Sequence, residues 1–276
     1  KNVYWKEETA DYCFRWLTNE LKIKPEKIVY KENLWEGGGN AGPCFEIIID
    51  GNEVATLVFM EFETRNGEYK PMDMKVVDTG YGLERHVWGS TGSKTIYDGI
   101  YSSLIEWLKK KAEKDDREAM HRIYQIADHS KSIMFILGDG VVPSNAQEGY
   151  LARLMIRRTF RNLEDLKLEN ILGEIVTKQI NEHKDVYPEF GENKEDILRM
   201  IEVEEKKYKD TLKRGEVLVK KILAERKKID EKSLIELYDS HGILPRDVKR
   251  FLPQIKVDLS DIDTKIAVRK SEAKLP

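Results

Sequence analysis

The sequence predicts an α+β protein in which an antiparallel sheet is followed by a mostly helical region. In the first third of the chain, short apolar runs are separated by glycine-containing turns, as in strands that are joined by hairpins. From about residue 96 the apolar residues instead recur three and four positions apart, which is the period of amphipathic helices. The polar run 109–118 marks the expected boundary.

The expected elements follow from these periods and from turn residues. The first part should hold a helix at 7–21, a glycine-dense loop at 33–44, strands at 45–50, 54–62 and 74–77, and a turn at 78–85 that opens a helix. Asp50, Gly51 and Asn52 are typical of a hairpin. The second part should hold a helix at 123–137, a helix started by a capping box at 144–147, a long charged helix at 194–229, and a short helix started by a second capping box at 233–236.

Composition restricts the function. The 276 residues include 47 basic and 50 acidic side chains, so contact with a nucleic acid would need a local basic face. Two cysteines cannot form a disulfide framework, and their spacing is not that of a zinc site. No apolar run approaches the roughly 20 residues of a membrane span, and the start does not resemble a signal peptide. We therefore expect a cytoplasmic protein without a membrane partner.

The turn at 78–85 is the first candidate site. Gly80 and Gly82 allow the backbone to approach a ligand closely, and the start of the following helix favours anions. Arg85 would lie in the first turn of that helix, where it could neutralise a polyphosphate, while Asp78 could hold a cationic group. An ordinary strand–turn–helix joint with two conformational glycines explains the pattern equally well.

The loop at 33–44 is the second candidate. Its three consecutive glycines could point several N–H groups into one anion-binding concavity, with Trp35 as a flat apolar wall. The alternative is a flexible surface loop whose Trp35 is anchored in the core.

Polar residues of the helical part form two further candidates. Arg153, Arg157 and Arg161 are four residues apart and should share one helix face, which would suit a phosphate backbone, with Asn145 at the amino end. Asp239 lies near a helix C-terminus, where a carboxylate opposes the helix dipole. The alternatives are a solvated arginine face and an Asx turn between two helices.

The order of the motifs resembles that of archaeal alanyl-tRNA synthetases. The resemblance covers about residues 30–253 and rests on six segments, which are Trp35–Cys44, Leu57–Phe62, Val77–Arg85, Ile126–Ser130, Val142–Asn145 and Leu237–Gly242. It implies the later half of a class II synthetase core at 1–112, a helical domain that recognises the tRNA acceptor stem at 113–253, and a linker toward an editing domain at 254–276.

The resemblance also implies a reaction, in which alanine and ATP form alanyl-adenylate and alanine then passes to tRNA(Ala). Asp78 would hold the alanine ammonium group as a catalytic residue, and Trp35 and Val58 would enclose the methyl group. Gly80 would allow close approach of the substrate.

On the nucleotide side of the implied site, Gly82 would allow close approach of ATP. Arg85 matches the class II motif 3 arginine that binds the ATP phosphates, and is the second catalytic residue. Magnesium is expected with ATP, and Glu46 is a candidate ligand.

In this family the tRNA identity signal is a G·U pair in the acceptor stem. Asn145 and Asp239 match the residues that read the pair, and Arg153, Arg157 and Arg161 would then hold the phosphates of the stem.

The chain departs from the family pattern because class II motifs 1 and 2 are not found, nor is the editing domain with its zinc site. We therefore expect this chain alone to be a poor or inactive synthetase, and we expect a missing N-terminal half as its partner. A fragment, a subunit of a split enzyme and a chain with omitted segments all fit. The alternatives of another class are a non-catalytic tRNA-binding module and a helical scaffold, in which the helix at 194–229 serves a protein partner.

Overall fold

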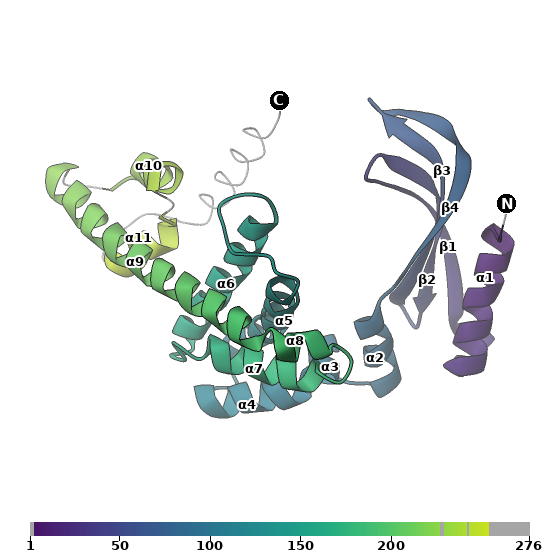
Figure 1. Ribbon diagram of the computed structural model, residues 1–276, viewed down its shortest axis with the longest axis horizontal. Helices are drawn as coiled ribbons and strands as arrows, with labels where there is room; N and C mark the ends of the chain where they lie inside the picture. The colour runs from purple at the N-terminus through teal and green to yellow at the C-terminus, as the bar shows by residue number, and fades with distance from the viewer. Residues whose placement is uncertain (1–2, 227–228, 242, 254–276) are drawn as a thin grey trace. The chain divides into compact units, whose positions relative to one another are not determined.

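The computed structural model describes residues 3–226, 229–241 and 243–253, without the side chains of Gln147, Arg226 and residues 238–241. The chain divides into two compact units, residues 1–107 and 108–276. Figure 1 shows the sheet and several helices in the first unit, and helices in the second. Within the described residues, no helix is long and apolar enough to span a membrane.

The first unit confirms the predicted antiparallel sheet. Its strands are β1 (Ile28–Gly37), β2 (Asn40–Ile49), β3 (Asn52–Arg65) and β4 (Glu68–Tyr81), and they are hydrogen-bonded in the order β1-β2-β3-β4. The helices are α1 (Lys6–Arg15), which continues as a π-helical turn at Trp16–Glu20, α2 (Leu83–Thr91), α3 (Ile96–Ile100) and α4 (Ser102–Ala112), the last of which contains the boundary between the units.

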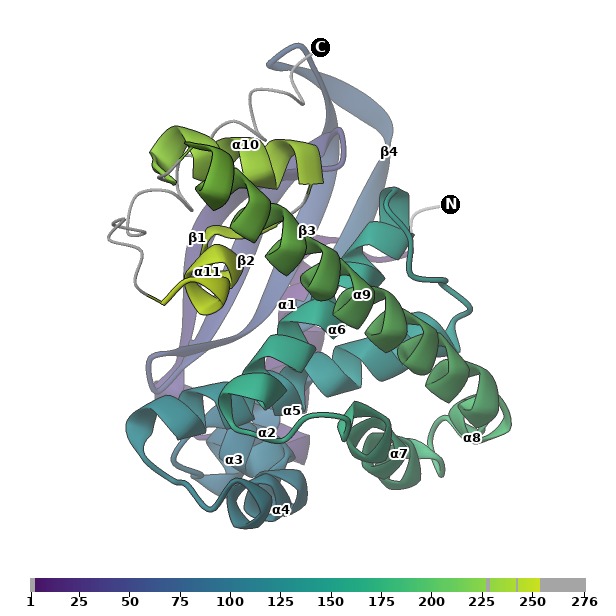
Figure 2. The ribbon, with the colours of Figure 1, turned by 90° about the vertical axis from the view of Figure 1, so that its left-hand side faces the viewer.

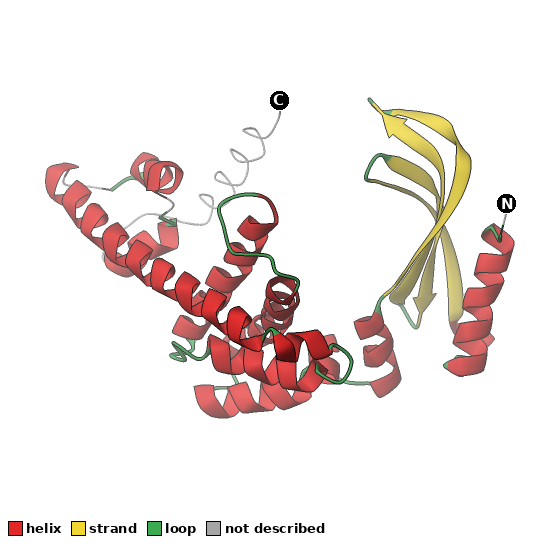
Figure 3. Ribbon diagram, in the orientation of Figure 1, coloured by secondary structure: helices red, strands yellow, loops and turns green. Residues whose placement is uncertain are grey.

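One face of the sheet packs against α1 and forms the core of the first unit (Figure 3). Cys13 and Leu17 from the helical segment are buried against Ile47, Leu57 and Phe59 from β2 and β3. Because side chains alternate along a strand, the residues between these core positions point to the opposite face. We call this opposite side the polar face, and it carries Lys31, Asn33, Trp35, Cys44, Glu46, Thr56, Val58, Asp78 and Gly80.

The glycine-dense segment differs from its prediction. It is not a loop, because β1 and β2 run through it and only Gly38 and Gly39 form the turn between them. Both glycines have positive φ values, 60° and 84°, which is the conformation that a tight hairpin turn requires. Gly37 lies within β1, so the three glycines do not form the predicted anion-binding concavity.

The elements in the described residues of the second unit are helices, as predicted (Figure 2). They are α5 (Arg117–Gly138), α6 (Gln147–Asp165), α7 (Leu172–His183), α8 (Pro188–Glu192), α9 (Lys194–Arg226), α10 (Glu231–His241) and α11 (Pro245–Phe251). The long helix α9 packs against α5, α6, α7 and α11, so its predicted apolar stripe belongs to the core.

The two predicted capping boxes are wrong in detail. Helix α6 begins two residues later than a Ser144 cap would require, and Ser144 instead hydrogen-bonds Ala146 in the preceding turn. At α10 the Asp230 carboxylate accepts a hydrogen bond from the Ser233 backbone N–H, and therefore Asp230 caps the helix in place of Ser233.

Two glycines of the sheet should respond differently to alanine. A Cβ at Gly42 would lie 1.8 Å from the carbonyl oxygen of Phe59, whereas a Cβ at Gly80 would meet nothing within 4 Å. We expect Gly42→Ala to lower the free energy of unfolding by about 3 kcal/mol because the backbones of β2 and β3 must separate. Gly80→Ala should change it by less than about 0.5 kcal/mol. Urea unfolding of the two variants checks this, and equal losses would contradict it.

Candidate functional site

Two rows of neighbouring residues cross the polar face. In the first row, Asp78 pairs with Val58, which pairs with Cys44, which pairs with Asn33. Residues that pair directly in antiparallel strands have Cβ atoms about 5 Å apart. Asp78 is exposed and Val58 is buried. The register therefore places a carboxylate that is open to solvent beside a small apolar side chain.

Trp35 shares this face but lies on β1, two strands from Val58, where it pairs with Gly42. Its ring lies along its own strand, since a Cβ at Gly37 would be 2.8 Å from Trp35 Cζ2. The sheet therefore brings Val58 and Asp78 together, while the Trp35 ring is turned toward the hairpin end of β1.

Glu46 belongs to the second row, between Lys31 and Thr56, and Thr56 pairs with Gly80. Lys31 Nζ donates to Glu46 over 2.7 Å and Asn33 Nδ2 over 2.8 Å, and these hydrogen bonds lower the pKa of the Glu46 carboxyl. Among the described residues, no group of three or more His, Cys, Asp or Glu side chains could hold a metal ion. Glu46 alone is therefore not a built metal site.

Arg85 lies in the first turn of α2, as predicted, and its guanidinium contacts Glu53 at the β2–β3 end of the sheet. Arg85 Nη1 donates to the Glu53 carbonyl over 2.9 Å and lies 3.6 Å from the carboxylate. That carboxylate accepts a hydrogen bond from Thr56 on the polar face. Gly82 leaves room for the Arg85 side chain, since a Cβ at this position would lie 3.0 Å from Arg85 Cδ.

Arg85 also lines a cavity of about 1300 Å³ in the first unit. Its other lining residues include Trp16, Trp88, Lys22 and Lys24. Asp78 does not line this cavity. Arg85 and Asp78, which were predicted to act together, therefore do not share this cavity, and the contacts of Arg85 reach the polar face through Glu53 and Thr56.

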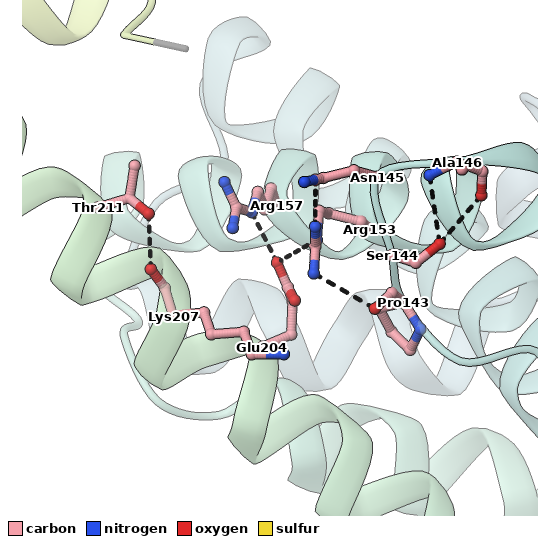
Figure 4. A network of polar contacts seen from close by, with 9 residues as sticks. All are labelled: Pro143, Ser144, Asn145, Ala146, Arg153, Arg157, Glu204, Lys207 and Thr211. Atoms are coloured by element: carbon pink, nitrogen blue, oxygen red, sulfur yellow. Dashed lines mark hydrogen bonds and ion pairs between the residues drawn. The ribbon is translucent and has the colours of Figure 1, made fainter. Parts of the chain in front are cut away.

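In the second unit, a network of polar contacts joins Asn145 to α6 and α9 (Figure 4). Arg153 Nε and Arg157 Nε donate to the same carboxylate oxygen of Glu204, over 3.0 and 2.7 Å. Only 1% of the Glu204 side chain is exposed. Arg153 also donates to Asn145 Oδ1 and to the carbonyl oxygen of Pro143.

The three arginines share one face of α6, as their spacing predicts, but this face packs against α9. Arg153 and Arg157 are committed to Glu204, and Arg161 contacts Tyr208. Burial and the nearby Arg246 lower the pKa of Arg161. The charges of Arg153 and Arg157 are therefore largely balanced inside the unit, and the contact of the three arginines with the phosphates of a stem stays a prediction.

Asp239 belongs to helix α10, but the structure describes only its backbone and not its side chain. Asn145 is exposed in the turn that precedes α6. Of the two side chains that were predicted to read a base pair, the structure thus describes only that of Asn145.

Sequence reasoning missed Glu204, although its spacing carried a signal. Ile197, Ile201 and Tyr208 define the buried stripe of α9, and Glu204 falls on the same stripe, three residues after Ile201 and four before Tyr208. An acidic residue on a buried helix face must find a cation. The three arginines of α6 were the available partners.

Comparison with known proteins identifies the class. The profile of the family described as "tRNA synthetases class II (A)" matches residues 1–121 and 105–275, which together span nearly the whole chain. The chain therefore belongs to the class II (A) tRNA synthetases.

Three individual proteins to which the chain is similar are all of one kind. The chain is 42% identical to the alanine–tRNA ligase of Pyrococcus furiosus and 41% identical to that of Pyrococcus abyssi, in each case over 99% of this chain and 37% of the relative. It is 39% identical to the alanine–tRNA ligase of Methanopyrus kandleri, over 95% of this chain and 34% of the relative. The chain thus spans little more than a third of the length of these relatives.

The Pyrococcus furiosus alignment runs over 337 positions, more than the 276 residues of this chain. The relative therefore carries additional residues within the aligned region as well as outside it.

Two of the carboxylates that hold arginines, those of Glu204 and Glu53, should differ in their contribution to stability. Glu204→Ala would leave two poorly exposed guanidiniums without their counterion, and we expect a loss of about 3–5 kcal/mol in the free energy of unfolding. Glu53→Ala, at an exposed pair, should cost at most about 1 kcal/mol. Chemical denaturation of both variants measures the difference, and a similar small loss for both would argue against the buried pair.

Proposed function

We propose that this chain forms part of an alanine–tRNA ligase, which activates alanine with ATP in the cytoplasm and transfers it to tRNA(Ala). Its membership of the class II (A) family and its archaeal relatives support the reaction class. The observation that carries the choice of alanine is the pairing of Asp78 with Val58 on the polar face.

The alanine site would be built on the first row of the polar face. The Asp78 carboxylate would bind the ammonium group of alanine, which is a charge-assisted contact. Val58, directly beside it, would lie against the methyl group. Trp35 would close the site from β1 only after its ring turns from the hairpin end of the strand toward Val58. At Gly80 the substrate could approach the backbone closely, because this position presents no side chain.

The ATP phosphates would be bound by Arg85, with Gly82 leaving room for its side chain. The guanidinium would have to leave Glu53, but both side chains of that pair are more than 40% exposed, so the exchange costs little. Magnesium would be held mainly by the phosphates, as is usual for this ion, and Glu46 could join only by giving up its contacts with Lys31 and Asn33.

The second unit would bind the acceptor stem of tRNA(Ala). Asn145 is exposed and held by Arg153, and we propose that it reads the G·U pair together with Asp239. A polar side chain discriminates between base pairs because a wrong pair leaves its hydrogen-bonding groups unsatisfied.

Alanine-dependent exchange of pyrophosphate into ATP tests the proposed reaction. We would measure it for this chain alone and for the chain combined with the parts of the Pyrococcus furiosus relative outside the aligned region. Exchange that depends on both components supports the proposal. Stem binding without exchange in either setting would favour the non-catalytic tRNA-binding module.

Asp78→Asn should impair the use of alanine far more than the binding of tRNA. Loss of the charged partner of the ammonium group should lower kcat/KM for alanine by about 100-fold in the combined enzyme. Asp73→Asn is the matched control, since it makes the same charge change at an exposed position of the same strand. Equal losses of alanine use and tRNA binding would contradict the role of Asp78.

Asn145→Ala should weaken discrimination in the second unit. We expect the preference of this chain for an acceptor-stem RNA hairpin with a G·U pair over one with G·C to fall about tenfold, because a side-chain contact with the pair is lost. Asn193→Ala, at an exposed asparagine elsewhere in the unit, should leave the preference unchanged. An unchanged preference in Asn145→Ala would reject its assignment.

A further inference from the structure

Asn145 lies in a turn whose backbone is tied to the start of α6. The Ser144 N–H donates to the Gly149 carbonyl over 2.9 Å. A Cβ at Gly149 would lie 2.5 Å from the carbonyl oxygen of Val142, which is backbone, so only glycine lets the turn lie this close to the helix. These contacts place the backbone of the turn but do not orient the exposed Asn145 side chain.

Arg153 supplies the missing constraint. Its Nε donates to Glu204 over 3.0 Å and its Nη2 donates to the Pro143 carbonyl over 3.3 Å. Because a guanidinium is rigid and planar, fixing two of its nitrogens fixes the direction of the third. The third nitrogen, Nη1, donates to Asn145 Oδ1 (Figure 4).

This contact also decides which end of the Asn145 amide is presented. An arginine side chain only donates hydrogen bonds, so the amide oxygen of Asn145 must face it. The two amide hydrogens then point away from Arg153. An asparagine held in this way offers donors to a ligand in a defined direction.

Glu204 holds the arginine in place. Its carboxylate is buried on α9 and shared by Arg153 and Arg157, and Arg157 also lies over the Tyr208 ring, 5.9 Å from its centroid. Burying a carboxylate is costly unless its partners are well placed. The guanidiniums of Arg153 and Arg157 therefore have little freedom to move away from Glu204. The carboxylate on α9 is thereby connected to the exposed amide before α6.

We propose that Arg153, anchored by Glu204, is a positioning residue that orients the Asn145 amide for the acceptor stem. The inference rests on the proposed function, in which Asn145 reads the base pair. Arg153 acts through Asn145 and needs no contact with RNA, which accounts for its place against α9. Arg153 follows Asn145 by eight residues. It lies in the second helical turn of α6, from which its side chain extends back to the segment that precedes the helix.

Arg153→Lys in the 276-residue chain tests this role. Lysine keeps the positive charge beside Glu204 but cannot donate in the three fixed directions of the guanidinium. We expect the preference for a G·U over a G·C hairpin to fall about tenfold, as in Asn145→Ala, and the Asn145/Arg153 double variant to lose no more than either single variant. Arg158→Gln, which removes an exposed charge from the same helix, is the control for a general loss of RNA attraction.

The outcomes separate the two proposals. A preference that Asn145→Ala leaves intact rejects the proposed reading of the pair, and the positioning role with it. A preference that is sensitive to Asn145→Ala but not to Arg153→Lys, or losses that add in the double variant, rejects the positioning role alone.

A second measurement does not depend on RNA. The side-chain amide resonance of Asn145, assigned by its absence in Asn145→Ala, should shift in Arg153→Lys and in Glu204→Gln but not in Arg158→Gln. Unchanged resonances in folded Arg153→Lys protein would overturn the inference.

Discussion

The polar face of the first unit depends on the register of its four strands. Side chains alternate along each strand, so a slip of one residue would move Asp78 from the polar face into the core beside Phe59. The core face opposes such a slip, since it would also move Val77, which pairs with Phe59 and packs against the core, to the opposite face. Hydrophobic packing on one side of the sheet therefore determines which polar groups meet on the other.

The second unit positions its polar groups by a different means. There a buried carboxylate, that of Glu204, gathers two guanidiniums from the neighbouring helix. Replacing all members of such a buried ion-pair network together by apolar side chains is often neutral or stabilising, although removing the carboxylate alone is costly, so the network contributes more to the direction of its side chains than to stability. In the sheet, side chains are oriented by the repeating backbone pairing of the strands. In the helical unit, Arg153 and Arg157 are oriented by the Glu204 carboxylate.

Much of the fold could be predicted from periodicity, but less of the site could. The sheet, the long helix α9 and the place of Arg85 in the first turn of α2 followed from local patterns. The extent of β1 and β2 did not, because glycine and proline depress strand propensity in a segment that tertiary pairing overrides.

The arginines of α6 show a second limit of the sequence. Helical spacing says which residues share a face, but it does not say what covers that face, and here α9 covers it. The same holds for Trp35, whose position on the polar face follows from the register while the direction of its ring does not.

Within the described part of the chain, β1 and β4 are the edges of the sheet, and each has one row of backbone groups without a neighbouring strand. Such edges invite two molecules to join strand to strand. The outer strand β4 carries Pro71, which cannot donate a backbone hydrogen bond, together with the charged side chains of Lys70, Asp73 and Lys75. This composition makes β4 a poor template for aggregation, so this edge of the sheet can remain unpaired beside the polar face.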